Sequence, residues 1–337
     1  MTYMRILLAT GIYPPDVGGP ARYVQSLERT LRDLGHEVSV LSYKLEKRLP
    51  FGARQILYFA RIFFATRKTD VIIAFDTVSV GFPTVVSSFL WGKKIAVRIG
   101  GDFLWEAYLE RKNIGIPIVD FYQALPALSF KEKVIIRIHQ FILDYSDFIV
   151  FSTSWQRDLW SSFYIVNPEK IRIIENCYYP KRKGESPKEK IFLAAGRQIA
   201  LKNFSKIEEG FERAKAIFPD IKLDKGSYST DEYEKKLKSC FAVVVASFSE
   251  ISPNSIIEAI AYNKPFILTK YNGILNRLNG AGVIVDPNDV ESLAKGFCIL
   301  AYDETYKDQI KDINKLSFVH SFNDIAKEFV EVLSDKS

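Results

Sequence analysis

The chain has 337 residues, of which 47% are hydrophobic, and this is enough to build two domains with apolar cores. Its three cysteines, Cys177, Cys240 and Cys298, are odd in number and lack metal-ligand spacing, so we exclude a disulfide framework and expect a reducing compartment. The net charge of +6 lies mostly in residues 1–165, where 20 Lys+Arg stand against 15 Asp+Glu, and no nucleic-acid recognition motif accompanies this basic excess.

The first half of the chain alternates strand and helix patterns. Apolar runs predict strands at residues 4–11, 37–43, 70–75, 94–101, 147–152 and 171–174, and a helical pattern covers residues 21–34. Strands separated by helical stretches pair in parallel. Residues 1–180 are therefore expected to form a Rossmann-like domain of an α/β protein.

The loop after the first strand contains Gly18 and Gly19. Because glycine has no side chain, the backbone here can approach a ligand closely. The surrounding P-P-D-V-G-G-P sequence lacks the G-x-G-x-x-G pattern, which counts against a nicotinamide-dependent oxidoreductase. The alternative to a ligand site is a tight turn.

Residues 44–68 combine seven basic residues and one acidic residue with several aromatic side chains. Such a segment can lie on an anionic membrane surface. It can equally be a crossover helix whose apolar side packs on the sheet while its basic side is solvated. Both interpretations stay open.

Asp102 and Glu106 follow the fourth predicted strand. Either carboxylate could accept a hydrogen bond from a sugar hydroxyl or act as a base. Each could instead cap the helix that is expected to begin near Phe103.

Residues 181–190, rich in Lys, Pro and Glu, are interpreted as a linker, and a second domain is expected at residues 191–320. Its first strand, 191–195, leads into Gly196, Arg197 and Lys202. The planar guanidinium of Arg197 can bind phosphate through two hydrogen bonds, and Lys202 adds a flexible positive charge. These residues predict a phosphate contact.

The apolar run at residues 241–247 predicts a strand covered on both faces, followed by Ser-Glu-Ile-Ser-Pro-Asn. Ser252 is expected to be the N-cap of the next helix and Pro253 its first residue. Glu250 then lies in the entering loop and Glu258 in the second helical turn. The alternative is a capped helix with two solvated glutamates.

The start of this helix also predicts an anion site. The backbone N–H groups of Asn254, Ser255 and Ile256 have no partner within the helix and would favour a negative charge. The carboxylates of Glu250 and Glu258 would repel an anion unless they bind its hydroxyl groups. A sugar nucleotide carries both phosphates and hydroxyls.

The remaining elements complete an α/β pattern. Strands are predicted at residues 265–269 and 282–286, and helices at 291–301 and 322–333. The last helix has apolar residues at helical spacing, which predicts a buried stripe.

Taken together, these motifs resemble those of the retaining glycosyltransferases of family 4. SEISPNSIIEAIAYNKPFILT, beginning at Ser249, is similar to the family's E-x7-E motif, and GRQIALKNF, beginning at Gly196, is similar to its G-R-x4-K segment. IRIIENCYYP and GVIVDPNDVESLA continue the resemblance. It implies the GT-B fold of two facing Rossmann-like domains, with residues 321–337 returning to the first domain.

The resemblance also implies roles for single residues. Arg197 and Lys202 would neutralise charge on the leaving diphosphate, a differential stabilisation of the transition state. Glu250 would hold the transferred sugar, and Glu258 would bind the ribose hydroxyls. Asp102 is a further catalytic candidate.

The same resemblance places other residues around the donor. Gly18 and Gly19 would lie between the donor phosphates and the acceptor. Gly196, Ser252, Pro253, Asn254 and Ser255 complete the set expected to bind the donor.

Two departures from the family pattern stand out. The loop near Asp102 lacks the histidine that many members have there. Between Lys202 and the glutamate motif, one strand–helix unit is missing, so the second domain is shortened. These departures motivate an alternative hypothesis, a catalytically silent relative that binds a sugar nucleotide or a partner enzyme.

The expected function is retaining transfer of a hexose from a nucleotide sugar, of UDP or GDP type, to a glycan, a lipid-linked or another acceptor in cell-envelope polysaccharide synthesis. We expect no cofactor and no metal, because neither a D-x-D motif nor a His/Cys/Asp cluster is present in the sequence. No apolar stretch has signal-peptide or membrane-spanning character, so a cytoplasmic protein is expected, with peripheral membrane contact through residues 44–68.

Overall fold

The computed structural model of the chain describes residues 3–16, 18–43, 46, 49–50 and 53–335. These residues form two compact units. The first unit contains the residues up to Leu104, Ala127–Cys177 and the residues from His320 onward. The second unit contains Trp105–Pro126 and Tyr178–Val319.

The first unit is built on a six-stranded parallel sheet with the strand order β2-β1-β3-β4-β5-β6. Its strands are β1 Arg5–Thr10, β2 Glu37–Ser42, β3 Val71–Phe75, β4 Lys94–Ile99, β5 Phe148–Phe151 and β6 Ile171–Ile173. All six strands were predicted from their apolar runs. The predicted Rossmann-like architecture is confirmed.

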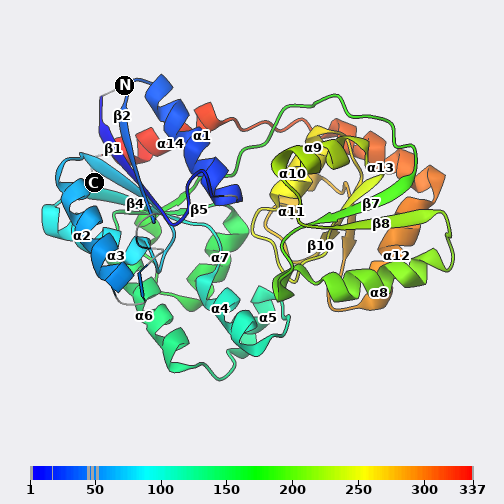
Figure 1. Cartoon of the computed structure of the whole chain (residues 1–337), viewed down its shortest axis with the longest axis horizontal. Helices are drawn as coiled ribbons and strands as arrows, with labels where there is room; N and C mark the ends of the chain where they lie inside the picture. Colours follow the sequence, from blue (N-terminus) through cyan, green and yellow to red (C-terminus); the bar gives the residue numbers. More distant parts are fainter. Residues whose placement is uncertain (1–2, 17, 44–45, 47–48, 51–52, 336–337) are drawn as a thin grey trace. The chain divides into compact units, whose positions relative to one another are not determined.

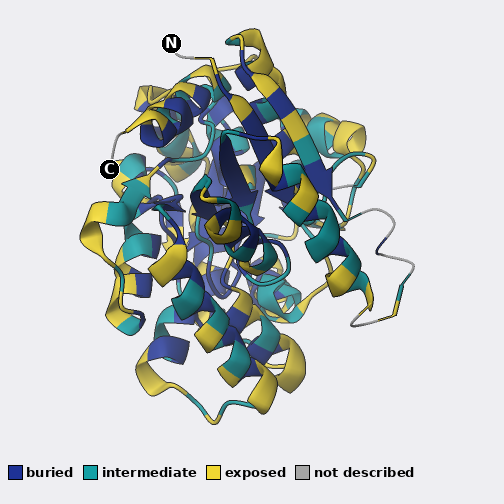
Figure 2. Ribbon diagram, turned by 90° about the vertical axis from the view of Figure 1, so that its left-hand side faces the viewer, coloured by how far each residue is buried: buried dark blue, intermediate teal, exposed yellow. Residues whose placement is uncertain are grey.

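Helices cover both faces of this sheet (Figure 1). On one face lie α1 Gly19–Asp33 and α14 Phe322–Ser334. On the other lie α2 Ala53–Arg67, α3 Gly81–Trp91, α6 Phe130–Tyr145 and α7 Ser154–Phe163. The central strands β1, β3, β4 and β5 are mostly buried, and exposed residues lie on the outer sides of the helices (Figure 2).

Helix α14 returns the chain to the first unit, and its predicted apolar stripe is buried there. Ile325 and Phe329 are fully buried and pack with Val24 and Leu27 of α1. Burial of such side chains contributes about 1.5–3 kcal/mol each.

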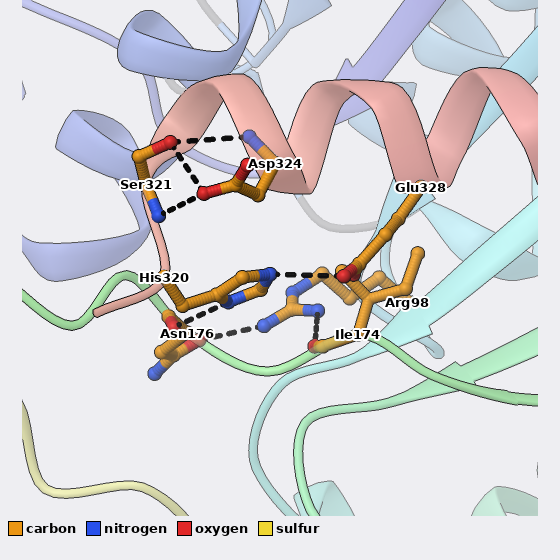
Figure 3. A network of polar contacts seen from close by, with 7 residues as sticks. All are labelled: Arg98, Ile174, Asn176, His320, Ser321, Asp324 and Glu328. Atoms are coloured by element: carbon orange, nitrogen blue, oxygen red, sulfur yellow. Dashed lines mark hydrogen bonds and ion pairs between the residues drawn. The ribbon is translucent and has the colours of Figure 1, made fainter. Parts of the chain in front are cut away.

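A polar network fixes the point where α14 begins (Figure 3). His320 contacts the Asn176 carbonyl through Nδ1 (3.1 Å) and the Glu328 carboxylate through Nε2 (3.0 Å). Arg98 donates to the Asn176 side chain (2.6 Å) and to the Ile174 carbonyl (2.8 Å). The segment leaving the first unit and the segment re-entering it are thus joined by hydrogen bonds within that unit.

The second unit contains a five-stranded parallel sheet with the order β11-β10-β9-β7-β8. Its strands are β7 Lys190–Ala195, β8 Ile221–Gly226, β9 Ala242–Val245, β10 Phe266–Thr269 and β11 Val283–Val285. The common doubly wound order has one more strand beyond the position of β8. This agrees with the predicted loss of a strand–helix unit.

Strand β8 was not predicted. Its sequence, IKLDKG, is largely polar, and it lies at the sheet edge with β7 as its single neighbour. An edge strand buries less apolar surface than a central strand, so its hydrophobic signal is weak.

Helices cover the second sheet on both faces as well. On one face lie α8 Phe204–Lys215 and α12 Val290–Ala301. On the other lie α9 Thr230–Ser239, α10 Asn254–Ala261, α11 Leu275–Leu278 and α13 Asp303–Lys315.

The unit boundaries differ from the sequence interpretation in two places. Residues 105–126, which carry most of α4 Phe103–Lys112 and all of α5 Ile118–Ala124, belong to the second unit and not to the first. The predicted linker 181–190 is also part of the second unit, where the Arg182 N–H donates to the Ala261 carbonyl (2.7 Å). The segment therefore forms backbone hydrogen bonds with the folded unit, although its composition is typical of a linker.

Candidate functional site

The strand order of the second sheet marks a ligand position. From β7 the chain moves through α8 to β8 on one side, and β9 lies on the other side of β7. Ligands of open α/β sheets bind outside the carboxyl ends of the strands where the order reverses in this way. The segment from Gly196 to Lys202 follows β7, and the segment from Ser247 to Glu250 follows β9, so both predicted motifs lie at this point.

Lys202 and Glu250 form an ion pair at the reversal point. The distance from Lys202 Nζ to Glu250 Oε1 is 2.6 Å, and the side chains are 27% and 15% exposed. Ser247 Oγ donates to the same Oε1 atom at 2.6 Å. The carboxylate therefore sits in one orientation, held by a cation and a hydroxyl, while remaining open to solvent.

The backbone of Glu250 is fixed as firmly as its side chain. Its N–H donates to the Tyr271 carbonyl (2.9 Å), and its carbonyl accepts from the Gly273 N–H (3.0 Å). These bonds form a parallel bridge to Asn272, just beyond the end of β10. The glutamate lies on a short strand-like extension of the sheet, a rigid support for a ligand contact.

The loop after β7 carries two cationic side chains, Lys202 and Arg197, in different surroundings. The Lys202 side chain lies over Gly196, with its Cδ atom 3.5 Å from the position that a Gly196 Cβ would take. The Arg197 side chain is exposed and makes no hydrogen bond or ion pair with the described residues. Asn203, in the left-handed region, holds the loop by donating to the Ala246 and Pro287 carbonyls (3.1 and 2.8 Å).

The start of α10 differs from the prediction. The helix begins at Asn254 with Pro253 in the N-cap position, and Ser252 is not the cap. The Ser252 hydroxyl is buried and has no partner among the described residues. The Ile256 N–H, expected to be available to an anion, donates to the Pro253 carbonyl (3.0 Å). Pro253 has a φ of −72°, which suits a helix, but its ψ of 98° is extended, so the helix starts one residue later than predicted.

Glu258 lies in the second turn of α10, as predicted, and beside Tyr233 of α9. Burial, and after it the Glu258 carboxylate, raises the pKa of Tyr233. Ser255 also lies beside this phenol. Sequence reasoning missed Tyr233, because a single tyrosine in a polar helix carries no recognisable motif.

The glutamate loop is also held by the segment from the first half of the chain that belongs to the second unit. The Ile118 N–H donates to Ser249 Oγ (2.9 Å). Gly115 lies against the ring of Phe248, which is 5% exposed, and a Gly115 Cβ would come within 1.6 Å of that ring. The two residues immediately before Glu250 are thus positioned by residues 115–118. Sequence reasoning could not find a contact between segments so far apart in the chain.

The predicted residues of the first unit occupy the corresponding edge of the first sheet. Gly18 precedes α1 and Gly19 is its first residue, so the helix begins two residues earlier than expected. The order of this sheet reverses between β1 and β3. Asp76, directly after β3, lies there and accepts from Ser79 Oγ (2.5 Å), and burial raises its pKa.

Asp102 is only 1% exposed and directly precedes α4. This position favours the predicted capping role over direct contact with a substrate. Glu106, one turn later, is exposed.

The part of the chain that the structure describes has no group of three or more His, Cys, Asp or Glu side chains able to hold a metal ion. No described helix is both long enough and apolar enough to cross a membrane.

The chain was compared with models of protein families and with curated protein sequences. Residues 196–303 match the family model described as glycosyl transferases group 1. This range contains Arg197, Lys202, Glu250 and Glu258. A comparison with curated protein sequences gave no match.

Solved structures share the fold over the whole chain. Sucrose-phosphate synthase from Thermosynechococcus elongatus is 13% identical, with a TM-score of 0.71 over 97% of this chain and 98% of that chain. Anabaena HepE in complex with UDP-glucose is 12% identical, with a TM-score of 0.71 over 98% and 99%. The lipopolysaccharide outer core galactosyltransferase WaaB is 14% identical, with a TM-score of 0.62 over 98% and 99%.

The chain therefore has the GT-B fold, two Rossmann-like units with parallel sheets, and the match at residues 196–303 supports a glycosyltransferase.

Proposed function

We propose that this protein transfers a sugar from a nucleotide-sugar donor that is bound by the second unit. The observation that carries the proposal is the Lys202–Glu250 ion pair at the carboxyl ends of β7 and β9. A cation for phosphate and a carboxylate for hydroxyl groups stand in contact at the position where open α/β sheets bind nucleotides.

Arg197 and Lys202 supply the charge that departure of a nucleoside diphosphate requires. Arg197 is exposed and able to bind two phosphate oxygens, and Lys202 can share its ammonium group between Glu250 and the diphosphate. Negative charge on the diphosphate grows as the bond to the sugar breaks, so these cations stabilise the transition state more than the ground state. The proposal assigns this neutralisation to side chains and not to a metal.

The two glutamates take different parts of the donor. Glu250, held by Lys202 and Ser247, accepts hydrogen bonds from the transferred sugar. Glu258, on α10 beside Tyr233, accepts hydrogen bonds from the ribose. In the first unit, Asp76 lies at the equivalent edge of its sheet and is assigned to the acceptor hydroxyl.

The proposal also names the chemical class of the donor and of the acceptor. HepE, which shares the fold, is described in complexes with UDP and with UDP-glucose, and this favours a UDP-hexose donor. WaaB, which also shares the fold, acts on the lipopolysaccharide outer core, and this favours a glycan or lipid-linked acceptor in cell-envelope synthesis. Retention of configuration and contact of residues 44–68 with the cytoplasmic membrane surface belong to the same proposal.

Thermal unfolding with UDP-, GDP- and ADP-sugars tests donor binding directly. A ligand at 100 times its dissociation constant adds about 2.7 kcal/mol to the free energy of unfolding, and we expect this for a UDP-hexose. Release of UDP is then assayed with and without EDTA, and equal rates are expected. Stabilisation without any turnover would instead support the silent relative, and no stabilisation by any nucleotide sugar would reject the proposal.

A further inference from the structure

Three helices of the first unit end at the same edge of its sheet. Strands β3, β4 and β5 are parallel neighbours and begin at Val71, Lys94 and Phe148. Helices α2, α3 and α6, which precede them in the chain, end at Arg67, Trp91 and Tyr145. Because short connections link each helix to its strand, the three helix ends gather at the amino edge of the sheet, opposite the edge at which ligands bind.

Two clusters of apolar side chains lie at these helix ends, one shared by α2 and α3 and the other by α3 and α6. We call these side chains the aromatic belt: Phe63, Phe64, Phe89, Leu90, Trp91 and Tyr145. The ring centroid of Phe63 lies 5.6 Å from that of Phe64 and 5.0 Å from that of Trp91. Phe89 lies 5.7 Å from Tyr145, and Leu90 lies between Phe89 and Trp91 in the chain. The belt therefore consists of two ring clusters, and both include residues from the last turn of α3.

The belt is exposed to an extent unusual for large apolar residues. Phe64 is 65% exposed, Phe89 66%, Leu90 58% and Tyr145 50%. Single exposed apolar residues are common, but contiguous ones mark an interaction surface. Trp91 donates its indole N–H to the Phe63 carbonyl (2.9 Å), which keeps the ring in place at the surface.

Charge indicates what kind of partner covers the belt. Neither α2 nor α3 contains an acidic residue, and exposed Arg67 and Lys68 lie beside the belt, with Arg67 stacked over Trp91 at 5.4 Å. Among the nearby acids, Asp70 pairs with Arg5, whereas exposed Asp144 accepts from the neutral Gln140 amide and keeps its charge, so Arg67 and Lys68 together outweigh it. Contact with a second copy across a two-fold axis would bring like basic groups together. An anionic surface is complementary.

We propose that the aromatic belt docks the first unit on an anionic lipid surface, with Phe89 and Leu90 as apolar anchors and Arg67, Lys68 and Lys93 as headgroup contacts. Tryptophan, tyrosine and phenylalanine bordered by Lys and Arg are typical of side chains at a membrane interface. The belt includes the last third of the segment 44–68 but adds α3, which sequence reasoning did not single out. Docking at the amino edge leaves the ligand-binding edge of the sheet uncovered.

Vesicle flotation of the whole chain tests the proposal. Vesicles containing phosphatidylglycerol should carry the wild type at low salt, and pure phosphatidylcholine vesicles should not. The double variants Phe89→Ser/Leu90→Ser and Lys68→Glu/Lys93→Glu should each lower the bound fraction about tenfold. Ile217→Ser, at a residue of the second unit that is 65% exposed, is the matched control and should float like the wild type.

Two further measurements separate lipid binding from misfolding and from self-association. Nucleotide-sugar stabilisation, measured on each variant, reports folding and donor binding independently of lipid, and it should be unchanged. Sedimentation tests the competing partner: a dimer that Phe89→Ser/Leu90→Ser dissociates would overturn the proposal in favour of self-association. Wild-type protein that stays unbound at low salt, or double variants that float like the wild type, would also overturn it.

Discussion

Lys202 donates a hydrogen bond to Glu250 across 2.6 Å, and this contact joins the two motifs that are 48 positions apart in the sequence. A carboxylate that shares one oxygen between an ammonium group and the Ser247 hydroxyl has its other oxygen available to a ligand. The pair therefore sets the orientation of a sugar contact and the position of a phosphate contact together. Substitutions at the two residues should not have additive effects.

Arg197→Ala and Lys202→Ala should each weaken turnover by about 2–4 kcal/mol of transition-state stabilisation, because each removes a cation from the leaving diphosphate. The two variants should differ in stability. The Arg197 side chain has no hydrogen bond or ion pair with the described residues, so its loss should leave the melting temperature unchanged, whereas loss of Lys202 leaves Glu250 without its cation. Steady-state kinetics and thermal unfolding measure both effects. Unchanged kinetics in both variants would remove the diphosphate assignment.

Gly115→Ala should displace the glutamate loop. The added methyl group would lie within 1.6 Å of the Phe248 ring, and this ring immediately precedes the loop that carries Glu250. Overpacking of this kind costs about 1–3 kcal/mol of stability, and we also expect slower transfer. Gly100→Ala is the matched control, because nothing lies within 4 Å of its added methyl group. Equal activity of the two variants would show that residues 115–118 do not position Glu250.

Asp102→Ala should act on stability and not on chemistry. Asp102 is 1% exposed and directly precedes α4, where a carboxylate that caps the helix contributes about 1 kcal/mol. Thermal unfolding should show the loss, and kcat of the folded fraction should stay within about twofold of the wild type. A kcat lowered a hundredfold at unchanged stability would instead support the catalytic role that the sequence suggested.

The pair of His320 and Glu328 should make stability depend on pH. The hydrogen bond that His320 Nε2 donates to the Glu328 carboxylate raises the pKa of His320 above its ordinary value. The pair's contribution is therefore full below the unfolded pKa of about 6.5 and is lost as pH rises through the folded pKa. Wild type and Glu328→Gln should differ most in free energy of unfolding near pH 6 and less near pH 9.

The difference between the wild type and Glu328→Gln cancels the contributions that the other histidines make to the pH dependence of stability. Burial lowers the pKa of His139 to about 3, so this residue stays neutral in both folded proteins. A difference that is constant from pH 6 to pH 9 would exclude the His320–Glu328 pair as its source.

Most strands could be predicted from the sequence, and so could the edge of the second sheet at which the motif residues lie. Long apolar runs such as residues 241–247 identified buried strands, because a strand covered on both faces has few polar positions. The edge strand β8 lacks that signal and was missed. The location of Gly196 and Glu250 at the same edge of the sheet follows from parallel pairing, which the alternation of elements predicts.

Other features depend on tertiary contacts that local patterns do not encode. The pairing of Lys202 with Glu250 required the register of β7 and β9. The contact of Gly115 with Phe248 and the proximity of Tyr233 to Glu258 join segments whose sequences give no sign of one another. The start of α10 was misplaced because Pro253 adopts an extended ψ of 98° and occupies the cap position itself.

Calorimetry on Glu250→Gln and Glu258→Gln, with UDP and with the intact UDP-hexose as ligands, tests the central claim that the second unit binds the donor through glutamates with separate roles. Glu258→Gln should weaken both ligands, because the amide loses a charged acceptor for the ribose hydroxyls. Glu250→Gln should leave UDP binding almost unchanged, because the amide oxygen can still accept from Lys202 and keep its ammonium group in place for phosphate. It should lower affinity for the intact donor and the rate of transfer. Equal weakening of UDP and donor by Glu250→Gln, or no change in either variant, would contradict the account.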